Sequence, residues 1–294
     1  MTSRTGMGRS RTGAESARQP AGFVRGHVKT GGLRLHYLDY GTEGRPAVLC
    51  LHGCGAHAHW FDFIAGGLSP DYHVLAMDQR GHGDSAWADP PDYSYERYAA
   101  DLAEAVDRLG LRDFTLLGHS MGGTVSLLYA ATYPGRAGRL IVADTTLHIP
   151  QNRIVAMRDV GLREGGRYDS LEEFVERYRL FPAATTAPPE VIAHLARNSA
   201  RRSDDGVWRN KVDRNVYASR YAMDCVPLWK RIGIPALLLK GARSARITPE
   251  IAAEVKAGCP QVEFAEVPES DHHVTLDNPS GFVDAIRPFL CRHS

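Results

Sequence analysis

The 294-residue sequence predicts an α/β fold with a mostly parallel, eight-stranded sheet flanked by helices. Short apolar runs of strand length alternate with segments of helical periodicity along most of the chain. One long central stretch departs from this alternation and has mainly helical patterns. Hydrophobic residues make up 43% and charged residues 23% of the chain, which is ordinary for a globular protein and excludes a disordered or collagen-like chain.

The predicted strands differ in whether one or both of their faces are buried. Leu33, Leu35 and Tyr37 alternate with polar residues, which indicates a strand with one buried face. The run from Pro46 to Leu51 is apolar throughout, as in a strand buried on both faces. The eight strands are predicted at Phe23–Tyr40 (two strands joined at Gly31-Gly32), Pro46–Leu51, Tyr72–Met77, Phe114–Leu117, Leu140–Ala143, Pro235–Leu239 and Val262–Val267.

Four helices are predicted among and after these strands. In the first, Tyr98, Leu102 and Ala105 fall on one apolar stripe of helical spacing. The second should end just before Pro134, which cannot continue a helix. The four are predicted at Tyr93–Leu109, Met121–Tyr133, Ile251–Ala257 and Phe282–Phe289.

Residues 148–233 break the alternation and contain no clear strand. Ser170 and Glu173 form a capping box at the start of one helix, and Pro188-Pro189 begins another. At roughly 85 residues this stretch is far longer than an ordinary connection. We therefore expect a core of residues 21–147 and 234–294, with a helical cap inserted between the sixth and seventh strands. An insertion remote from any site is the alternative.

Residues 1–20 differ in composition from the rest of the chain. They contain four arginines, one acidic residue and no aromatic residue, so a disordered basic tail is expected, with a functional arm as the alternative. The segment has no apolar core of the kind found in secretory signals. Because 35 basic and 34 acidic residues give a net charge of only +1, the sequence argues against a nucleic-acid or membrane-surface binder.

The cysteines and the apolar runs indicate where the protein resides. No run approaches the roughly 20 apolar residues of a membrane span. The five cysteines are odd in number and lack metal-binding spacing, so we expect free thiols in a cytoplasmic protein. The sequence leaves open whether the protein is a monomer or a homodimer.

The strongest motif is Gly118-His119-Ser120-Met121-Gly122, which follows a predicted strand and opens a predicted helix. A tight turn in this context strains the serine backbone and exposes its hydroxyl at the carboxyl end of the sheet. The small residues Gly118 and Gly122 leave room for the crossing chains. The N-terminus of the following helix favours negative charge that develops near Ser120. We therefore predict that Ser120 is a nucleophile, the alternative being a purely structural turn.

With these motifs, residues 22–292 resemble the α/β-hydrolase superfamily, and within it the capped esterase and lactonase branches. Besides the Ser120 turn, the resemblance depends on two loops, His52-Gly53-Cys54-Gly55 and Asp78-Gln79-Arg80-Gly81-His82-Gly83-Asp84-Ser85, and on His272 with Pro279 seven residues later. It implies a nucleophile, a histidine base and an acid in that superfamily's fold.

A base and an acid are needed to activate a serine. The resemblance places the base on the loop after the last strand, which indicates His272, with His273 as the alternative. The acid usually follows the seventh strand, but no carboxylate occurs there before Glu250. Asp144 follows the sixth strand, where some branches of the superfamily place the acid. We predict the triad Ser120, Asp144 and His272, with Glu250 or water supporting the histidine as the alternative.

The resemblance also implies a pocket with two backbone N–H donors for a developing oxyanion, from Cys54 and Met121. Side chains of the cap and of the nearby loops are predicted to line the pocket, although a core role is at least as plausible for several of them. These predicted pocket residues are Gly53, Trp60, His119, Trp208, Tyr217, Tyr221 and Trp229.

The sequence indicates no cofactor and no metal. His52, His57 and His59 with Asp78 are the strongest metal candidates, but they match no known zinc-binding spacing. The expected function is that of a serine hydrolase acting on an ester or lactone of a small to medium hydrophobic molecule through an acyl-enzyme. The alternatives are carbon–carbon bond hydrolysis on the same triad and a non-catalytic ligand-binding protein. The expected partner is a small-molecule substrate, with neither nucleic acid nor membrane.

Overall fold

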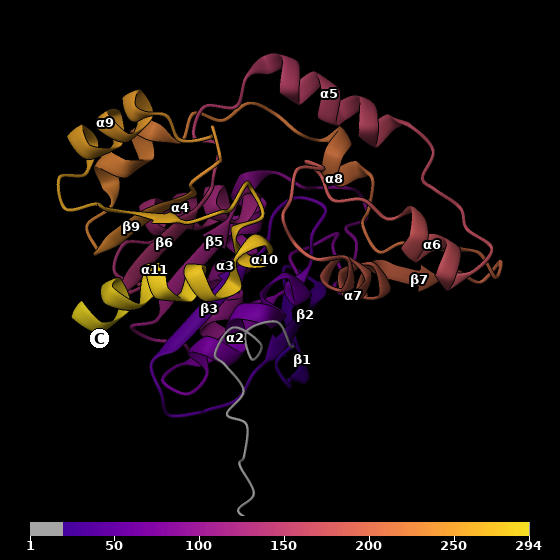
Figure 1. Cartoon of the computed structure of the whole chain (residues 1–294), viewed down its shortest axis with the longest axis horizontal. Coiled ribbons are helices and arrows are strands. Elements are labelled where there is room, and N and C mark those ends of the chain that lie inside the picture. Colours follow the sequence, from indigo (N-terminus) through magenta and orange to yellow (C-terminus); the bar gives the residue numbers. More distant parts are fainter. Residues whose placement is uncertain (1–19, 294) are drawn as a thin grey trace, which may run out of the picture.

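The structure, a computed structural model, describes residues 20–293 (Figure 1). The predicted tail, apart from residue 20, lies outside the described residues. A single sheet contains eight strands in the order β1-β2-β4-β3-β5-β6-β9-β10, which confirms the predicted class. The strands are β1 Val24–Thr30, β2 Leu33–Asp39, β3 Ala47–Leu51, β4 His73–Met77, β5 Thr115–His119, β6 Arg139–Ala143, β9 Ala236–Gly241 and β10 Glu263–Val267.

Strand β2 runs antiparallel to both of its neighbours, β1 and β4. From β4 to β10 all neighbours are parallel, so the carboxyl ends of these strands lie along one edge. Ligands bind at this edge in open α/β sheets. The loops that follow β3, β5, β6 and β10 therefore come together there, although their residues are far apart in sequence.

Helices cover both faces of the sheet. Buried residues of α3 and α4 form one core cluster with the strands, and buried residues of α2 and α11 belong to a second cluster on the other face. The helices outside residues 148–233 are α2 Asp62–Leu68, α3 Tyr95–Arg108, α4 Met121–Thr132, α9 Pro249–Gly258, α10 Val274–Asp277 and α11 Pro279–Arg292, with a short 3₁₀ helix η1 at Ala58–Phe61. Within residues 20–293, no helix is both long and apolar enough to cross a membrane.

Residues 148–233 connect β6 to β9. Residues 151–218 lie beyond the strands (Figure 1), whereas residues 226–231 pack against α4 and α9. Ser170 begins α6 as predicted, because its hydroxyl accepts a hydrogen bond from the Glu173 N–H at 3.1 Å. The helices of this stretch are α5 Gln151–Leu162, α6 Leu171–Arg177, α7 Pro189–Ser199 and α8 Asn215–Ala218, followed by the 3₁₀ helix η2 Val226–Arg231.

The expectation that this stretch has no strand was wrong. Two short strands, β7 Ala200–Arg202 and β8 Trp208–Asn210, pair antiparallel. The turn between them contains Gly206 at φ +80°, a conformation that favours glycine. The hydrophobic pattern of the sequence does not predict this hairpin, because β7 and β8 contain charged residues and neither strand has an apolar face long enough to show alternation.

Candidate active site

Ser120 lies between the end of β5 and the start of α4, as the motif predicted. Its backbone has φ 54° and ψ −117°, which is strained for a residue with a side chain. The neighbouring backbones hold it there, since the Ser120 N–H donates to the Ala143 carbonyl at 3.0 Å. A Cβ on Gly122 would lie 2.2 Å from the Leu51 carbonyl oxygen, so only glycine fits where α4 crosses β3.

His272 and Asp144 meet at the same edge of the sheet. His272 follows β10, and its Nδ1 lies 2.7 Å from Oδ2 of Asp144 at the end of β6. Asp144 is fully buried, and the Gly241 N–H donates to its Oδ1 at 3.1 Å. The acid predicted after the sixth strand is therefore hydrogen-bonded to the predicted base.

Ser244 and Arg246, which follow β9, also contact Asp144. The sequence analysis did not predict a role at the site for either residue. The hydroxyl of Ser244 donates to Oδ2 at 2.9 Å, and Nε of Arg246 lies 3.4 Å from the same oxygen. The loop that carries an acid in many family members here supplies donors that hold an acid from the neighbouring strand. The absence of a carboxylate in this loop was the signal that could have suggested them.

The alternative residues point elsewhere. Nε2 of His273 hydrogen-bonds to the Pro182 carbonyl at 2.8 Å. Glu250 is exposed in the first turn of α9. Nε2 of His119 donates to the carbonyl of His272 at 2.8 Å, and the two rings lie 4.8 Å apart. His119 thus supports the backbone of the loop that carries His272.

Two adjoining cavities open beside Ser120. The first contains Ser120, His272 and the predicted pocket residues Gly53, Trp60, His119 and Tyr217, together with Cys54. The second contains Ser120 with Cys54 and Met121, the two predicted oxyanion-binding residues. A Cβ on Gly55, which has φ +76°, would lie 2.1 Å from the Tyr217 hydroxyl, so glycine lets this side chain approach the loop after β3.

Three predicted pocket residues lie outside both cavities, which corrects their assignment. Trp229 is fully buried in the core cluster that contains α3 and α4. The Tyr221 hydroxyl donates to Glu96 at 2.6 Å and accepts from the Tyr95 N–H. Trp208 lies in β8, where its backbone pairs with Tyr168. Large residues of an insertion can pack in a hydrophobic core instead of lining a pocket. Their spacing in the sequence does not distinguish the two roles.

The cavities are also less apolar than expected. Arg153 from α5, Arg220 after α8 and Arg246 after β9 all line the second cavity beside Ser120. Sequence reasoning missed these three arginines, because their segments are separated by tens of residues and none lies in a motif.

Burial and nearby cations set the electrostatics of the histidine. Burial, followed by the charge of Arg246, lowers the pKa of His272 well below its usual range. Burial raises the pKa of Asp144, and the donors Gly241 and Ser244 oppose that shift. At neutral pH the imidazole is therefore uncharged and able to accept a proton.

The predicted metal candidates do not converge on one point. His52 accepts a hydrogen bond from the Gln79 N–H at 3.0 Å, and Nε2 of His57 lies 2.8 Å from the Ser199 hydroxyl. Asp78 is one of three possible ligands in a different group, with His36 and Asp84, whose ligand atoms lie within 4.8 Å of one another.

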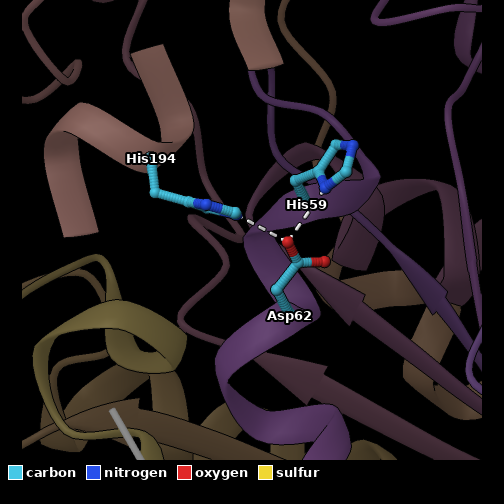
Figure 2. Close-up of side chains that lie close together, drawn as sticks. All are labelled: His59, Asp62 and His194. Atoms are coloured by element: carbon cyan, nitrogen blue, oxygen red, sulfur yellow. Dashed lines mark hydrogen bonds and ion pairs between the residues drawn. The ribbon is translucent and has the colours of Figure 1, made fainter. Parts of the chain in front are cut away.

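A second group of possible ligands joins α2 to α7. Figure 2 shows His59 and His194 directed at one carboxylate oxygen of Asp62, with nitrogen–oxygen distances of 2.9 and 2.7 Å. The Tyr40 hydroxyl donates to the other oxygen at 2.6 Å. Burial alone would raise the pKa of Asp62, but hydrogen bonds from His194 and His59 hold it below its usual range. Both carboxylate oxygens of Asp62 therefore already accept hydrogen bonds from neighbouring side chains.

The fold and this constellation define a class of protein, and comparison with known families agrees. Residues 46–279 match the family described as the alpha/beta hydrolase fold, and the chain belongs to that family. It is 31% identical over 268 residues to a Bacillus subtilis protein with the provisional name 2-succinyl-6-hydroxy-2,4-cyclohexadiene-1-carboxylate synthase, covering 88% of this chain and 95% of the relative. It is also 29% identical over 256 residues to an esterase of Mycobacterium tuberculosis, covering 83% of each chain.

Among solved structures, that of E-2-(acetamidomethylene)succinate hydrolase superposes with a TM-score of 0.80 at 25% identity. The match covers 92% of this chain and all of the other. The predicted membership of the α/β-hydrolase superfamily and the predicted fold class are thus confirmed. According to their names, these relatives act on different molecules.

Proposed function

We propose that this protein is a serine hydrolase that cleaves an ester or lactone of a small to medium organic molecule through an acyl-enzyme. The observation that carries the proposal is the 2.7 Å contact between His272 Nδ1 and Asp144, in a cavity that also contains the strained Ser120. The esterase among the relatives is consistent with this chemistry. A lactone is an internal ester, so the same steps open it.

In the proposed reaction, Ser120 Oγ attacks the carbonyl carbon while His272 Nε2 takes its proton. The Cys54 and Met121 N–H groups stabilise the oxyanion. His272 then returns the proton to the leaving oxygen, and the acyl-enzyme forms. Water attacks the acyl-enzyme with His272 again as base, which releases the acid and restores the Ser120 hydroxyl. Asp144 holds the histidine tautomer with its proton on Nδ1 and stabilises the imidazolium.

We further propose that residues 148–233 act as a cap over this site. Arg153 and Met157 of α5 line one cavity, and Tyr178 and Tyr217 line the other. All four come from the inserted stretch, so the substrate would lie between the insertion and the sheet. The five cysteines are free, which favours the expected cytoplasmic location.

Carbon–carbon bond hydrolysis on the same triad is the second candidate. Family members with that activity often carry asparagine before the serine, whereas this chain has His119, whose Nε2 donates to the His272 carbonyl. A panel of esters, lactones and vinylogous diketones separates the two candidates. We expect turnover of esters or lactones by the wild-type protein and none by Ser120→Ala. Cleavage of diketones alone would reject the ester proposal, and stoichiometric product retention would favour a ligand-binding protein.

The lowered pKa of His272 predicts an unusual pH dependence. The base must be uncharged, so kcat/KM falls only as the pH drops through the pKa of His272, and we expect this acid limb below about 6.5. Arg246→Met removes a cation that disfavours the imidazolium, so the limb should move to higher pH. The measurement is a pH profile with the neutral substrate p-nitrophenyl acetate. A limb that stays in place in Arg246→Met would contradict the electrostatic assignment.

A further inference from the structure

The second cavity contains an unusual cation. The Arg220 side chain is only 3% exposed, and its Nε and Nη1 are buried without a hydrogen-bond partner. Its Nη2 contacts the sulfur of Met121, and the guanidinium carbon lies 5.1 Å from the centre of the Tyr95 ring. Among residues 20–293, Arg220 has no ion pair with a carboxylate. A buried guanidinium is normally paired, because a buried charge with unsatisfied donors destabilises the fold.

Arg220 has two cationic neighbours in the same cavity. Within the described part of the chain, the Arg153 side chain forms a single hydrogen bond, to the Thr146 hydroxyl at 3.3 Å, and Arg246 donates to the same hydroxyl at 2.7 Å. Burial, followed by the charge of Arg153, lowers the pKa of Arg246 to about 10. Asp144, which pairs with Arg246, is engaged by His272. Among residues 20–293, neither Arg153 nor Arg220 pairs with a carboxylate, so positive charge is concentrated in this cavity.

We propose that Arg220, with Arg153 beside it, binds a carboxylate of the substrate, so that the hydrolysed ester or lactone carries an anionic group within a few atoms of the scissile bond. This inference rests on the proposed function and names its substrate class. A carboxylate would supply the negative charge and the hydrogen-bond acceptor that Arg220 lacks, because Nε and Nη1 have no partner. An anionic substrate differs from the hydrophobic substrate that the sequence predicted.

The placement of Arg220 also suggests what the site rejects. A neutral substrate leaves the buried guanidinium of Arg220 unpaired, which weakens its binding. The site therefore selects anionic over neutral substrates both by binding the anion and by this penalty for the neutral molecule. Because Arg220 contacts Met121, whose N–H is a proposed oxyanion donor, an effect on the oxyanion itself is the rival role. The two roles predict different results with matched substrates.

The test uses ester pairs that differ only by methylation of a carboxylate. One pair carries the charge on the acyl side: p-nitrophenyl hydrogen glutarate and its methyl ester. The other carries it on the alcohol side: 4-acetoxybenzoate and its methyl ester. We expect the wild-type protein to prefer the anionic member of at least one pair. Arg220→Met should reduce that preference in kcat/KM by about 10- to 100-fold. Arg220→Lys should retain part of it.

Arg243→Met is the matched control. Arg243 is an exposed arginine in the same loop as Arg246, and it lines neither cavity at Ser120. This variant removes one positive charge near the site and should keep the wild-type preference. Equal losses for both members of each pair in Arg220→Met would overturn the inference and favour the oxyanion role. No preference for either anion in the wild-type protein would overturn it as well.

A binding measurement separates this inference from the proposed function. Calorimetry with glutarate needs no turnover, and we expect affinity in the wild-type protein that is weakened about 10-fold or more in Arg220→Met. Circular dichroism and thermal unfolding verify that each variant is folded. Glutarate binding without any esterase activity would support the anion site and contradict the proposed function. Hydrolysis of neutral esters without glutarate binding would reject the anion site alone.

Discussion

Ser120→Ala is expected to lower kcat for the best ester or lactone by about 10⁶-fold, with little change in KM. The variant loses the only proposed nucleophile, while the cavity walls and the oxyanion donors remain. The measurement is steady-state kinetics on purified protein with thermal unfolding as a control for folding, since the alanine keeps the strained backbone of the turn.

The matched control is Ser126→Ala. Ser126 lies on α4, is fully buried, and has a hydroxyl without a hydrogen-bond partner. Its removal should leave kcat within about a factor of three, because the hydroxyl contributes no hydrogen bond. A Ser120→Ala protein that keeps a tenth of wild-type activity would remove Ser120 from the mechanism.

Asp144→Asn should lower kcat by about 10⁴-fold. An amide has one acceptor oxygen, whereas the carboxylate accepts from His272, Ser244 and Gly241 on its two oxygens. In either orientation the amide nitrogen faces an existing donor. His272 would then be held in the wrong tautomer or lose its partner, and its imidazolium would lack a counter-charge in the transition state.

Glu250→Gln tests the alternative acid by the same chemical change. Glu250 is exposed in the first turn of α9, and its substitution should leave activity near the wild-type value. If Asp144→Asn stayed within a factor of two of the wild type while Glu250→Gln lost activity, the acid would lie after strand seven instead. The pair of variants therefore decides between the two positions.

Features with a local physical cause were predictable from the sequence. The eight strands follow from short apolar runs, and the Ser120 turn follows from the glycines that its crossing chains need. The position of Asp144 at the carboxyl edge was predictable because β6 and β10 are parallel and end at the same edge of the sheet, although β9 lies between them. In each case a short segment carries the signal.

Features that depend on tertiary packing were not predictable. Helix α5 has no clear apolar stripe, since only Ile154 of its twelve residues is buried, so its periodicity did not reveal it. Trp229 is large and aromatic, as many pocket-lining residues are, but it is buried in the core. Arg220 carries no motif, and its importance arises only from burial beside Met121 without a carboxylate partner. Burial and missing partners are properties of the fold, which one sequence does not display.

Peptide mapping after treatment with a fluorophosphonate tests the central claim most directly. The reagent phosphonylates a serine only where a neighbouring base activates it and an oxyanion hole receives the phosphoryl oxygen. The account predicts one adduct per chain, on Ser120, with loss of ester turnover in proportion to labelling and no adduct in Ser120→Ala. An unmodified Ser120 in a protein that still hydrolyses esters, or stoichiometric labelling at another residue, would contradict it.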